Sequence, residues 1–402
     1  MSSTKSTAVV EAIRLQTAGR DPERLALKIA KMKESPFVFF RGAAHLFYDT
    51  LPDHPVLDDA PLAWCCGDLH FENFGSYKAD NRLAYFDIND FDEAALAPCT
   101  WDIVRLLTSI RCGADVLRAT SDEAILLARD CLVAYRGALM QGKPMWVERD
   151  TAKGLIHELM AGLQERSRAE FLDGRTIKKG GVRQLKVDGV KALPASREER
   201  DQVTTFLKGF AAGQESPAFY KVLDVARRIA GTGSLGVARF VILIEGKGSP
   251  DGNYLLDLKE SKPSALLPNL KRRHIAQPNW ANEAQRVVAV QKRMQAVDHA
   301  FLVPVDYADT SCILRGLQPS EDRVAMADWG KKLSRLQEVV SVMGRLAAWD
   351  QLRSSGRDDA ACADRLIAFA AKDDWLEPML ELVDALVKTT VTQWEDFREN
   401  YP

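Results

Sequence analysis

Apolar side chains along much of the chain recur every three or four positions, which is the spacing of amphipathic helices. This spacing starts at residue 7 and continues to residue 33. Within this stretch, Asp21-Pro22 is a typical opening for a second helix. Further helices are predicted over residues 101–112, 121–140, 151–168, 199–230, 282–297, 325–352 and 358–398. The pattern therefore predicts a protein built mainly from helices.

Short apolar runs rich in β-branched and aromatic residues interrupt the helical pattern and predict strands. One such run lies at residues 83–86, and the others lie later in the chain, at 237–244, 253–260, 301–305 and 311–317. A hairpin is predicted over residues 178–190, because Asp188-Gly189 is a favoured two-residue turn. We therefore expect an α+β protein with a small antiparallel β region.

The strand predicted at residues 83–86 ends in three carboxylates, Asp87, Asp90 and Asp92. Carboxylates this close disfavour ionisation unless a cation is present, and Mg²⁺ is the hard cation that takes carboxylates together with phosphate oxygens. Upstream, Asp68 and Asn73 follow Gly67. An Asp and an Asn at this spacing, followed by a strand and a metal-binding Asp, are typical of kinase-type phosphoryl transfer.

A solvated acidic loop is the alternative, since Asp and Asn are common turn residues. Against it, apolar side chains interleave with the polar ones, namely Ala63, Trp64, Leu69, Phe71, Phe74 and Phe91. Buried charges need partners, so this setting favours a functional site. The local pattern leaves open which of these carboxylates holds the metal, with Asp90 and Asp87 as the two candidates.

Gly231, Gly233 and Gly236 fit the pattern Gly-x-Gly-x-x-Gly, with Ser234 among them. In a dinucleotide-binding fold this motif follows a strand and opens a helix. Here a predicted helix precedes the motif and the strand at residues 237–244 follows it. The motif therefore favours a Gly-rich flap over nucleotide phosphates, as in kinases.

Lys259 lies on the next predicted strand, where a kinase places its contact to the α- and β-phosphates. A solvent-facing Lys would be the simpler interpretation of a single residue, but the Gly-rich turn before it favours the phosphate contact. In the following helix, Glu283, Gln285 or Gln291 could reach Lys259, and Glu283 is counted as a candidate for the nucleotide site.

Two further charged residues stand in apolar surroundings. Arg41 interrupts an aromatic-rich run and needs an anion, which is either a carboxylate of the protein or, less simply, a phosphate. Asp102 stands near the start of the helix predicted at residues 101–112. It either caps that helix or accepts a hydrogen bond from the loop that carries Asp68.

The order of these motifs differs from that of an ordinary kinase, because Asp68 comes before the Gly-rich turn. Read cyclically from residue 231, the kinase order returns, with Gln318-Pro319 as a hinge. We therefore expect a two-lobed, protein-kinase-like fold that is circularly permuted, with a small antiparallel β lobe and a larger helical lobe. The expected domains are 1–220 (helical lobe with the catalytic and metal loops), 221–320 (β-rich nucleotide-binding lobe) and 321–402 (helices completing the helical lobe).

Several stretches together resemble the bacterial family called domain of unknown function 2252 (DUF2252). They are CGDLHFENFG, FDINDFDEA, WDIVRL, SPFVFFRGAA, DVARRIAGTGSLGVARF, LDLKES and QRVVAVQKRMQA. The resemblance covers most of the chain, roughly residues 30 to 350. This family is related to the kinase-like superfamily that includes aminoglycoside phosphotransferases, whose loop reads His-Gly-Asp-x-x-x-x-Asn.

The resemblance implies that Asp68 is the catalytic base, that Asn73 and Asp90 hold Mg²⁺, and that Lys259 contacts phosphate. The chain departs from the phosphotransferase pattern at Cys66, where they have His. It departs again at residues 348–351, which read Ala-Trp-Asp-Gln. Both departures bear on the acceptor more than on the nucleotide.

The composition limits which binding partners and which cellular compartment we expect for this protein. The 402 residues carry a net charge of −2, which gives no bulk attraction to nucleic acid or to an anionic membrane. No apolar run approaches the ~20 residues of a membrane span, and the start of the sequence has no signal-peptide core. The seven cysteines are scattered, as in reduced cytosolic proteins, and His is too scarce for a zinc site. The expected location is the cytoplasm.

These features predict an ATP- and Mg²⁺-dependent phosphotransferase that acts on a small molecule or a protein. One alternative is nucleotidyl (AMP) transfer, with ATP bound in the opposite sense. Another is a non-catalytic, pseudokinase-like module that binds nucleotide without turnover.

Overall fold

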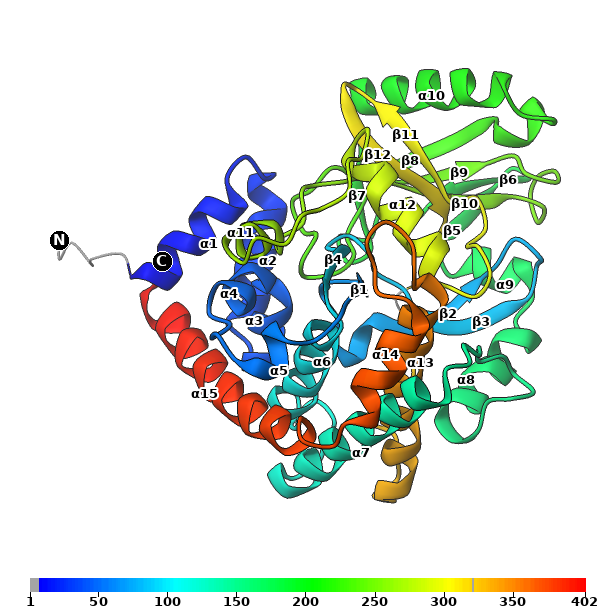
Figure 1. The fold of residues 1–402 in the computed structure, drawn as a ribbon. Helices are drawn as coiled ribbons and strands as arrows, with labels where there is room; N and C mark the ends of the chain where they lie inside the picture. Colours follow the sequence, from blue (N-terminus) through cyan, green and yellow to red (C-terminus); the bar gives the residue numbers. More distant parts are fainter. Residues whose placement is uncertain (1–6, 320–321) are drawn as a thin grey trace, which may run out of the picture.

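The computed structural model describes residues 7–319 and 322–402 as a mixed α+β fold, which confirms the predicted class (Figure 1). Its largest sheet has six strands in the order β11-β12-β10-β9-β8-β7, and every neighbouring pair is antiparallel. The strands are β7 (Ala192–Pro194), β8 (Val222–Arg228), β9 (Arg239–Ile244), β10 (Tyr254–Glu260), β11 (Val303–Tyr307) and β12 (Thr310–Gly316). The predicted antiparallel β region is therefore present.

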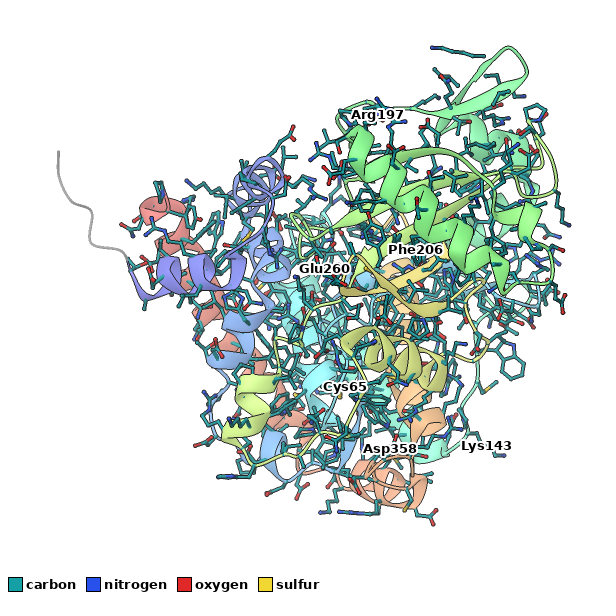
Figure 2. The ribbon with its side chains drawn as sticks, turned by 90° about the horizontal axis from the view of Figure 1, so that it is seen from above. Cys65, Lys143, Arg197, Phe206, Glu260 and Asp358 are labelled. Atoms are coloured by element: carbon teal, nitrogen blue, oxygen red, sulfur yellow. The ribbon has the colours of Figure 1, made fainter. Side chains whose placement is uncertain are left out.

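One face of this sheet is apolar and is covered by α10 (Arg197–Ala212). Alternate residues of the strands point toward the helix, so that Ile242 and Leu256 pack with Val203 and Leu207 of α10. Figure 2 shows α10 lying across the sheet, with Phe206 labelled, and the Phe206 ring lies 5.5 Å from that of Tyr307. The opposite face carries Arg239, Asp257 and Lys259 on neighbouring strands.

The sheet begins earlier in the chain than the boundary placed at residue 221. Two short elements before it, α9 (Arg168–Asp173) and the hairpin β5 (Thr176–Lys179)–β6 (Val182–Leu185), pack with the sheet through Leu172 and Leu185. Beyond the strands, α11 (Leu267–Arg272) and α12 (Glu283–Met294) connect β10 to β11.

Two local predictions in this region are wrong. Residues 222–228 form β8, not the end of a helix, because their backbone pairs with β9 and β7, and α10 already ends at Ala212. The hairpin turns at Gly180-Gly181, where φ is +56° and +79°, and not at Asp188-Gly189. Asp188 instead accepts N–H bonds from Val190 and Lys191 ahead of β7.

Helices make up most of the rest of the described chain. The N-terminal ones are α1 (Ala8–Thr17), α2 (Pro22–Met32), α3 (Pro36–Gly42), α4 (Ala44–Asp49) and α5 (Pro55–Asp58). The central and C-terminal ones are α6 (Thr100–Cys112), α7 (Ser121–Gln141), α8 (Gly154–Glu165), α13 (Leu333–Ser354), α14 (Ala363–Ala371) and α15 (Leu376–Asn400). Single turns of 3₁₀ helix lie at Phe71–Asn73 and Pro217–Tyr220.

The main core lies among α6, α7 and α13. A Cβ added to Gly344 of α13 would lie 2.2 Å from the carbonyl oxygen of Cys131, so only glycine allows α7 and α13 to approach this closely. At the other side, α1 packs against α15 through Ile13 and Phe397, so the first and last described helices are neighbours (Figure 1).

Two small two-stranded sheets stand beside this core and carry the candidate catalytic loops. They pair β1 (Leu62–Cys65) with β4 (Ala95–Pro98), and β2 (Phe74–Lys78) with β3 (Ala84–Ile88). Neither is part of the six-stranded sheet. Across the described ranges, no helix is long and apolar enough to cross a membrane.

Candidate functional site

A cavity of about 690 Å³ lies where the charged face of the six-stranded sheet meets the loops after β1 and β3. Nearly all of the predicted site residues line it, namely Asp68, Asn73, Asp90, Gly231, Gly233, Ser234, Gly236 and Lys259. These residues come from two stretches of chain more than a hundred positions apart. The fold therefore brings together what the sequence only suggested.

Asp68 lies on the cavity wall in an ion pair with Arg105 of α6. The Nε of Arg105 donates to Oδ1 of Asp68 over 2.8 Å, and the guanidinium, itself fully buried, lies 4.0 Å above the centre of the Phe40 ring. Burial raises the pKa of Asp68, although the charge of Arg105 opposes this shift. The carboxylate is thus oriented by a fixed cation and still retains basicity.

Asp102, also on α6, fixes the backbone just before Asp68. Its carboxylate accepts the N–H groups of Cys66 and Gly67 over 2.7 and 3.0 Å, which confirms the hydrogen bond to the loop that carries Asp68. Burial outweighs these bonds and raises the pKa of Asp102 to about 6. Gly67 has φ of +87°, and a Cβ there would lie 2.1 Å from the carbonyl oxygen of Glu93, so the loop requires glycine.

Asn73 and Asp90 face the same cavity. The amide nitrogen of Asn73 donates to the carbonyl oxygen of Asp68 over 2.5 Å, which leaves its amide oxygen as the atom able to hold a cation. Burial tends to raise the pKa of Asp90, but the charges of Lys259, Arg315 and Arg239 outweigh it and lower the pKa. Asp90 is therefore ionised, as a metal ligand must be.

Asp87, the alternative ligand, does not line this cavity. It is a buried residue of β3 and lies beside Asp350 of α13, whose Oδ1 accepts a 2.9 Å bond from Arg353. Burial raises the pKa of both carboxyl groups. The charge of Asp87 raises the pKa of Asp350 further, whereas a hydrogen bond with Asp350 lowers the pKa of Asp87. Across the described ranges, no three His, Cys, Asp or Glu side chains cluster as a complete metal site.

Lys259 is buried on β10 and forms an ion pair with Asp92. The expectation that Glu283, Gln285 or Gln291 would reach Lys259 is not met. Glu283 lies outside the cavity and pairs with Arg286, one turn along α12, over 2.6 Å. The helix acts on the site differently, because Arg286 donates to the carbonyl oxygens of Ala94 and Asp92 over 2.5 and 2.9 Å.

The Gly-rich segment is the connection between antiparallel β8 and β9, so it is a hairpin loop and not the turn of a dinucleotide-binding βαβ unit. Three cations from α2 and the residues before it hold its carbonyl groups. Arg20 donates to Gly233 and Leu235 over 2.7 and 2.8 Å, and Arg24 donates to Val237 over 3.0 Å.

Lys28 is the third of these cations and is the most deeply buried. Its Nζ donates to the carbonyl oxygens of Gly42, Thr232 and Gly233 over 2.7, 3.2 and 3.1 Å. Burial, together with the charge of Arg20, lowers the pKa of Lys28 well below its usual value. No pattern in the sequence links this helix to a loop some two hundred positions later, so its role is a finding of the structure.

Other charged groups at the site also escaped sequence reasoning. Glu93 lines the cavity, and burial raises its pKa to about 7. Behind Lys259, the buried Asp257 accepts bidentate bonds from Arg239 over 2.8 and 2.6 Å and pairs with Arg228 over 2.7 Å. Successive side chains of a strand point to opposite faces, so Asp257 and Lys259 lie on the same face of β10. This spacing was the signal in the sequence that could have placed Asp257 at the site.

Arg41 also borders the cavity. Its Nη1 lies 2.6 Å from Oε2 of Glu72, so the simpler interpretation, an ion pair within the protein, is correct.

Residues 20–400 match the family described as an uncharacterized protein conserved in bacteria (DUF2252). The chain belongs to the DUF2252 family. The match extends from α2 to the end of α15 and so includes every residue of the site described above. No curated protein and no solved structure matches the chain.

Proposed function

We propose that this DUF2252 chain is an ATP- and Mg²⁺-dependent phosphotransferase with a circularly permuted, kinase-like fold. The acceptor is a small molecule or a protein. One observation carries the proposal, which is that the Gly-rich hairpin, Lys259 and the Asp68–Asn73–Asp90 group line a single cavity. Kinases combine a Gly-rich loop, a strand Lys, a catalytic Asp and a metal-binding Asn and Asp in this way.

The element order around the sheet supports the same assignment. The Gly-rich loop joins β8 to β9, Lys259 lies on the next strand, and α12 follows before the last two strands. A kinase has the same succession, with its Lys on the third strand. The neighbouring positions of α1 and α15 are compatible with a permuted chain, because joining such ends and cutting elsewhere preserves the packing.

In this proposal each side chain has one task. Asp68, held by Arg105 and with a raised pKa, accepts the proton of the acceptor hydroxyl. Lys259 and the loop around Ser234 bind the phosphates, and Asn73 and Asp90 would hold Mg²⁺. Bound Mg²⁺-ATP supplies the phosphoryl group and neutralises charge that develops on it, while the protein contributes position and electrostatics.

Nucleotidyl transfer is a second candidate, because Lys259 pairs with Asp92 of the metal loop and not with a carboxylate of α12, as it would in a kinase. Intact-mass analysis of the protein and of candidate acceptors after incubation with Mg²⁺-ATP distinguishes the two by the size of the adduct. Titration of ATP with and without Mg²⁺ tests the site itself. Binding without any turnover would identify a pseudokinase, and absence of binding would refute the proposal.

A further inference from the structure

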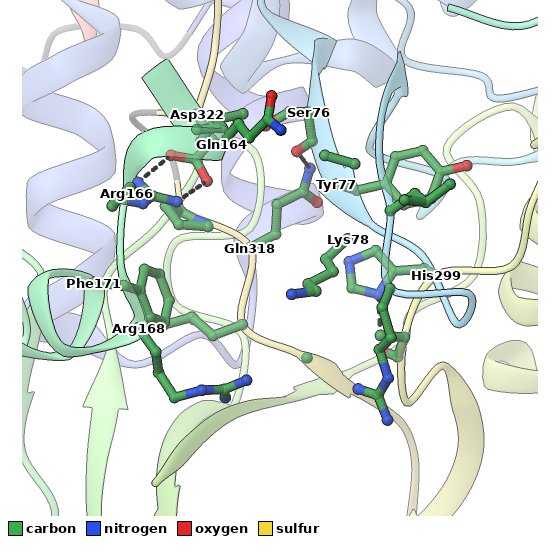
Figure 3. Close-up of a pocket in the computed structure, with 18 of the residues that line it drawn as sticks. Ser76, Tyr77, Lys78, Gln164, Arg166, Arg168, Phe171, His299, Gln318 and Asp322 are labelled. Atoms are coloured by element: carbon green, nitrogen blue, oxygen red, sulfur yellow. Dashed lines mark hydrogen bonds and ion pairs between the residues drawn. The ribbon is translucent and has the colours of Figure 1, made fainter. Parts of the chain in front are cut away.

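A second cavity, of about 600 Å³, shares no lining residue with the first (Figure 3). Its walls come from the β2–β3 hairpin, the end of α8 and start of α9, β10, and the segment that leaves β12. Its volume is in the range of small-molecule sites.

The charge lining this cavity is unbalanced. It has five cationic side chains, Lys78, Arg82, Arg149, Arg166 and Arg168, and three carboxylates, Glu148, Asp150 and Asp322. Two of the carboxylates are already paired with cations. Asp150 pairs with Arg149 over 2.5 Å, and Asp322 pairs with Arg166 over 2.9 Å (Figure 3).

Lys78, Arg82 and Arg168 are the cations left over. Within residues 7–319 and 322–402, no carboxylate lies within ion-pair distance of any of the three. Partial burial lowers the pKa of Lys78, and the charges of Arg168, Arg82 and Lys247 lower it further. The mutual repulsion of these groups is unfavourable in the free protein and would be relieved by an anion.

Aromatic rings hold the guanidinium groups in place. Arg168 lies 3.8 Å from the centre of the Tyr254 ring, and Arg82 lies 5.9 Å from that of Phe301. The two rings meet at 79° with their centres 5.9 Å apart. Stacking on a ring leaves the N–H edge of a guanidinium free for an acceptor, so these cations are oriented to bind an anion beside an apolar surface.

We propose that this cavity binds a small organic anion, in which a phosphate, sulfate or carboxylate contacts Lys78 and Arg168 and a flat apolar group packs on Tyr254 and Phe301. The site is separate from the cavity that contains Asp68 and does not depend on its function. A ligand here would contact both the β2–β3 hairpin and β10, which belong to different sheets.

The test uses two probes of similar shape, anilinonaphthalene sulfonate and phenylnaphthylamine, which lacks the sulfonate. Fluorescence titration of the full chain should show saturable binding of the sulfonate probe. Lys78→Ala/Arg168→Ala should weaken that binding about tenfold or more, since each lost charge-assisted contact is worth roughly a factor of ten. Binding of the neutral probe should change little, whereas Tyr254→Ala should weaken both probes.

Lys372→Ala/Arg197→Ala is the matched control, because it removes one Lys and one Arg from exposed positions outside both cavities. If the alanine variant melts at a lower temperature than the parent, the same titration is made with Lys78→Gln/Arg168→Gln, which removes both charges but retains polar side chains. Any of four results would overturn the proposal. The first two are that the parent does not bind the sulfonate probe and that both cavity variants bind it as well as the parent does. The other two are that the control loses as much binding as the cavity variants and that binding is lost only in Lys259→Ala.

Discussion

At Asp68, burial and the ion pair with Arg105 act in opposite directions, and the balance sets its chemistry. The cation alone would make Asp68 a weak base, while burial alone would favour its protonated form. Because burial outweighs the cation, the pKa of Asp68 is raised, and the side chain is held in one orientation by a guanidinium that is itself fixed among Phe40, Phe47 and Tyr48.

Asp68→Asn retains the shape and most hydrogen bonds of this side chain but removes the proton acceptor. We expect ATP hydrolysis or transfer to fall by about 10²–10⁴-fold, the usual contribution of a general base, with nucleotide affinity nearly unchanged. A hydrolysis assay with an ATP-binding titration measures both. Asp122→Asn, at an exposed position on α7, is the control. A variant that hydrolyses ATP as fast as the parent would exclude Asp68 as the base.

Asp102 gives a prediction about pH and stability. Its pKa is about 6 in the folded protein against an ordinary value of 3.8, so the folded state retains a proton that the unfolded chain loses. Retaining this proton stabilises the folded state. The contribution to the free energy of unfolding is fully present below about pH 4, and about 3 kcal/mol of it is lost as the pH rises through about 6. In Asp102→Asn this loss should vanish.

Chemical denaturation of the parent and of Asp102→Asn across this pH range checks the prediction. Other buried acids titrate in both proteins, so the informative quantity is the difference between their free energies of unfolding. This difference should shift in favour of the variant as the pH rises. A difference that stays constant would show that Asp102 has an ordinary pKa in the folded protein.

At the scale of elements, the Gly-rich loop is supported by α2, although the two are far apart in sequence. Each of Arg20, Arg24 and Lys28 donates to carbonyl groups of the loop or of the residues just after it. A hairpin loop held from outside in this way is less free to move than one with only its own strands for support. The protein therefore pre-organises this wall of the cavity.

Lys28→Met retains the apolar stem but removes the three hydrogen bonds of Nζ. Hydrogen exchange of the amides at residues 232–236 should accelerate about tenfold or more, because bonds to a charged donor are worth more than 1 kcal/mol. Nucleotide should also bind more weakly. Lys31→Met, at an exposed position of the same helix, should change neither quantity. Unchanged exchange in Lys28→Met would show that the loop does not depend on α2.

Helices and strands whose apolar residues recur at a regular spacing could be predicted from the sequence. Those that depend on contacts with distant parts of the chain could not. The helix over residues 121–140 and the strand at 253–260 are observed nearly as predicted. Residues 222–228 form a strand and not the predicted helix, because their pairing with β9 and β7 overrides the local propensity and cannot be seen in the local pattern. The hairpin turned at Gly180-Gly181 because two successive positive φ angles suit glycine better than Asp-Gly.

The same division holds for the site. Asp68, Asn73, Asp90 and Lys259 could be found because each stands in a local motif. Lys28 and Arg105 could not, because each acts through a partner that is remote in sequence.

At the scale of the whole molecule, the first cavity is shared between the six-stranded sheet and the helical part. Gly233 and Lys259 come from the sheet side, while Asp68 and Asp90 come from the loops beside α6. A ligand that contacts both sides therefore stabilises their relative position in addition to filling the cavity. Its binding can be measured as an increase in the stability of the whole protein, even when the acceptor is not known.

Asp90 and Asp87 are a matched pair for this measurement, because Asp87 is buried on β3, Asp90 is half-buried just after β3, and only Asp90 faces the cavity. With ATP and Mg²⁺ at 100 times Kd, the parent should gain about 2.7 kcal/mol of stability over the free protein. In Asp90→Ala the part of this gain that requires Mg²⁺ should disappear, because the proposed ligand is absent. Asp87→Ala should retain it, whatever the substitution does to the stability of the free protein.

Thermal unfolding of each variant with ATP alone, with Mg²⁺ alone and with both separates these effects, since each variant serves as its own reference. Adding EDTA should return the parent and Asp87→Ala to the values measured with ATP alone. Loss of the Mg²⁺-dependent gain in Asp87→Ala and its retention in Asp90→Ala would show that the metal lies behind β3 with Asp350. That result would place the chemistry away from Asp68 and Lys259, and the proposed phosphotransferase site would then be wrong.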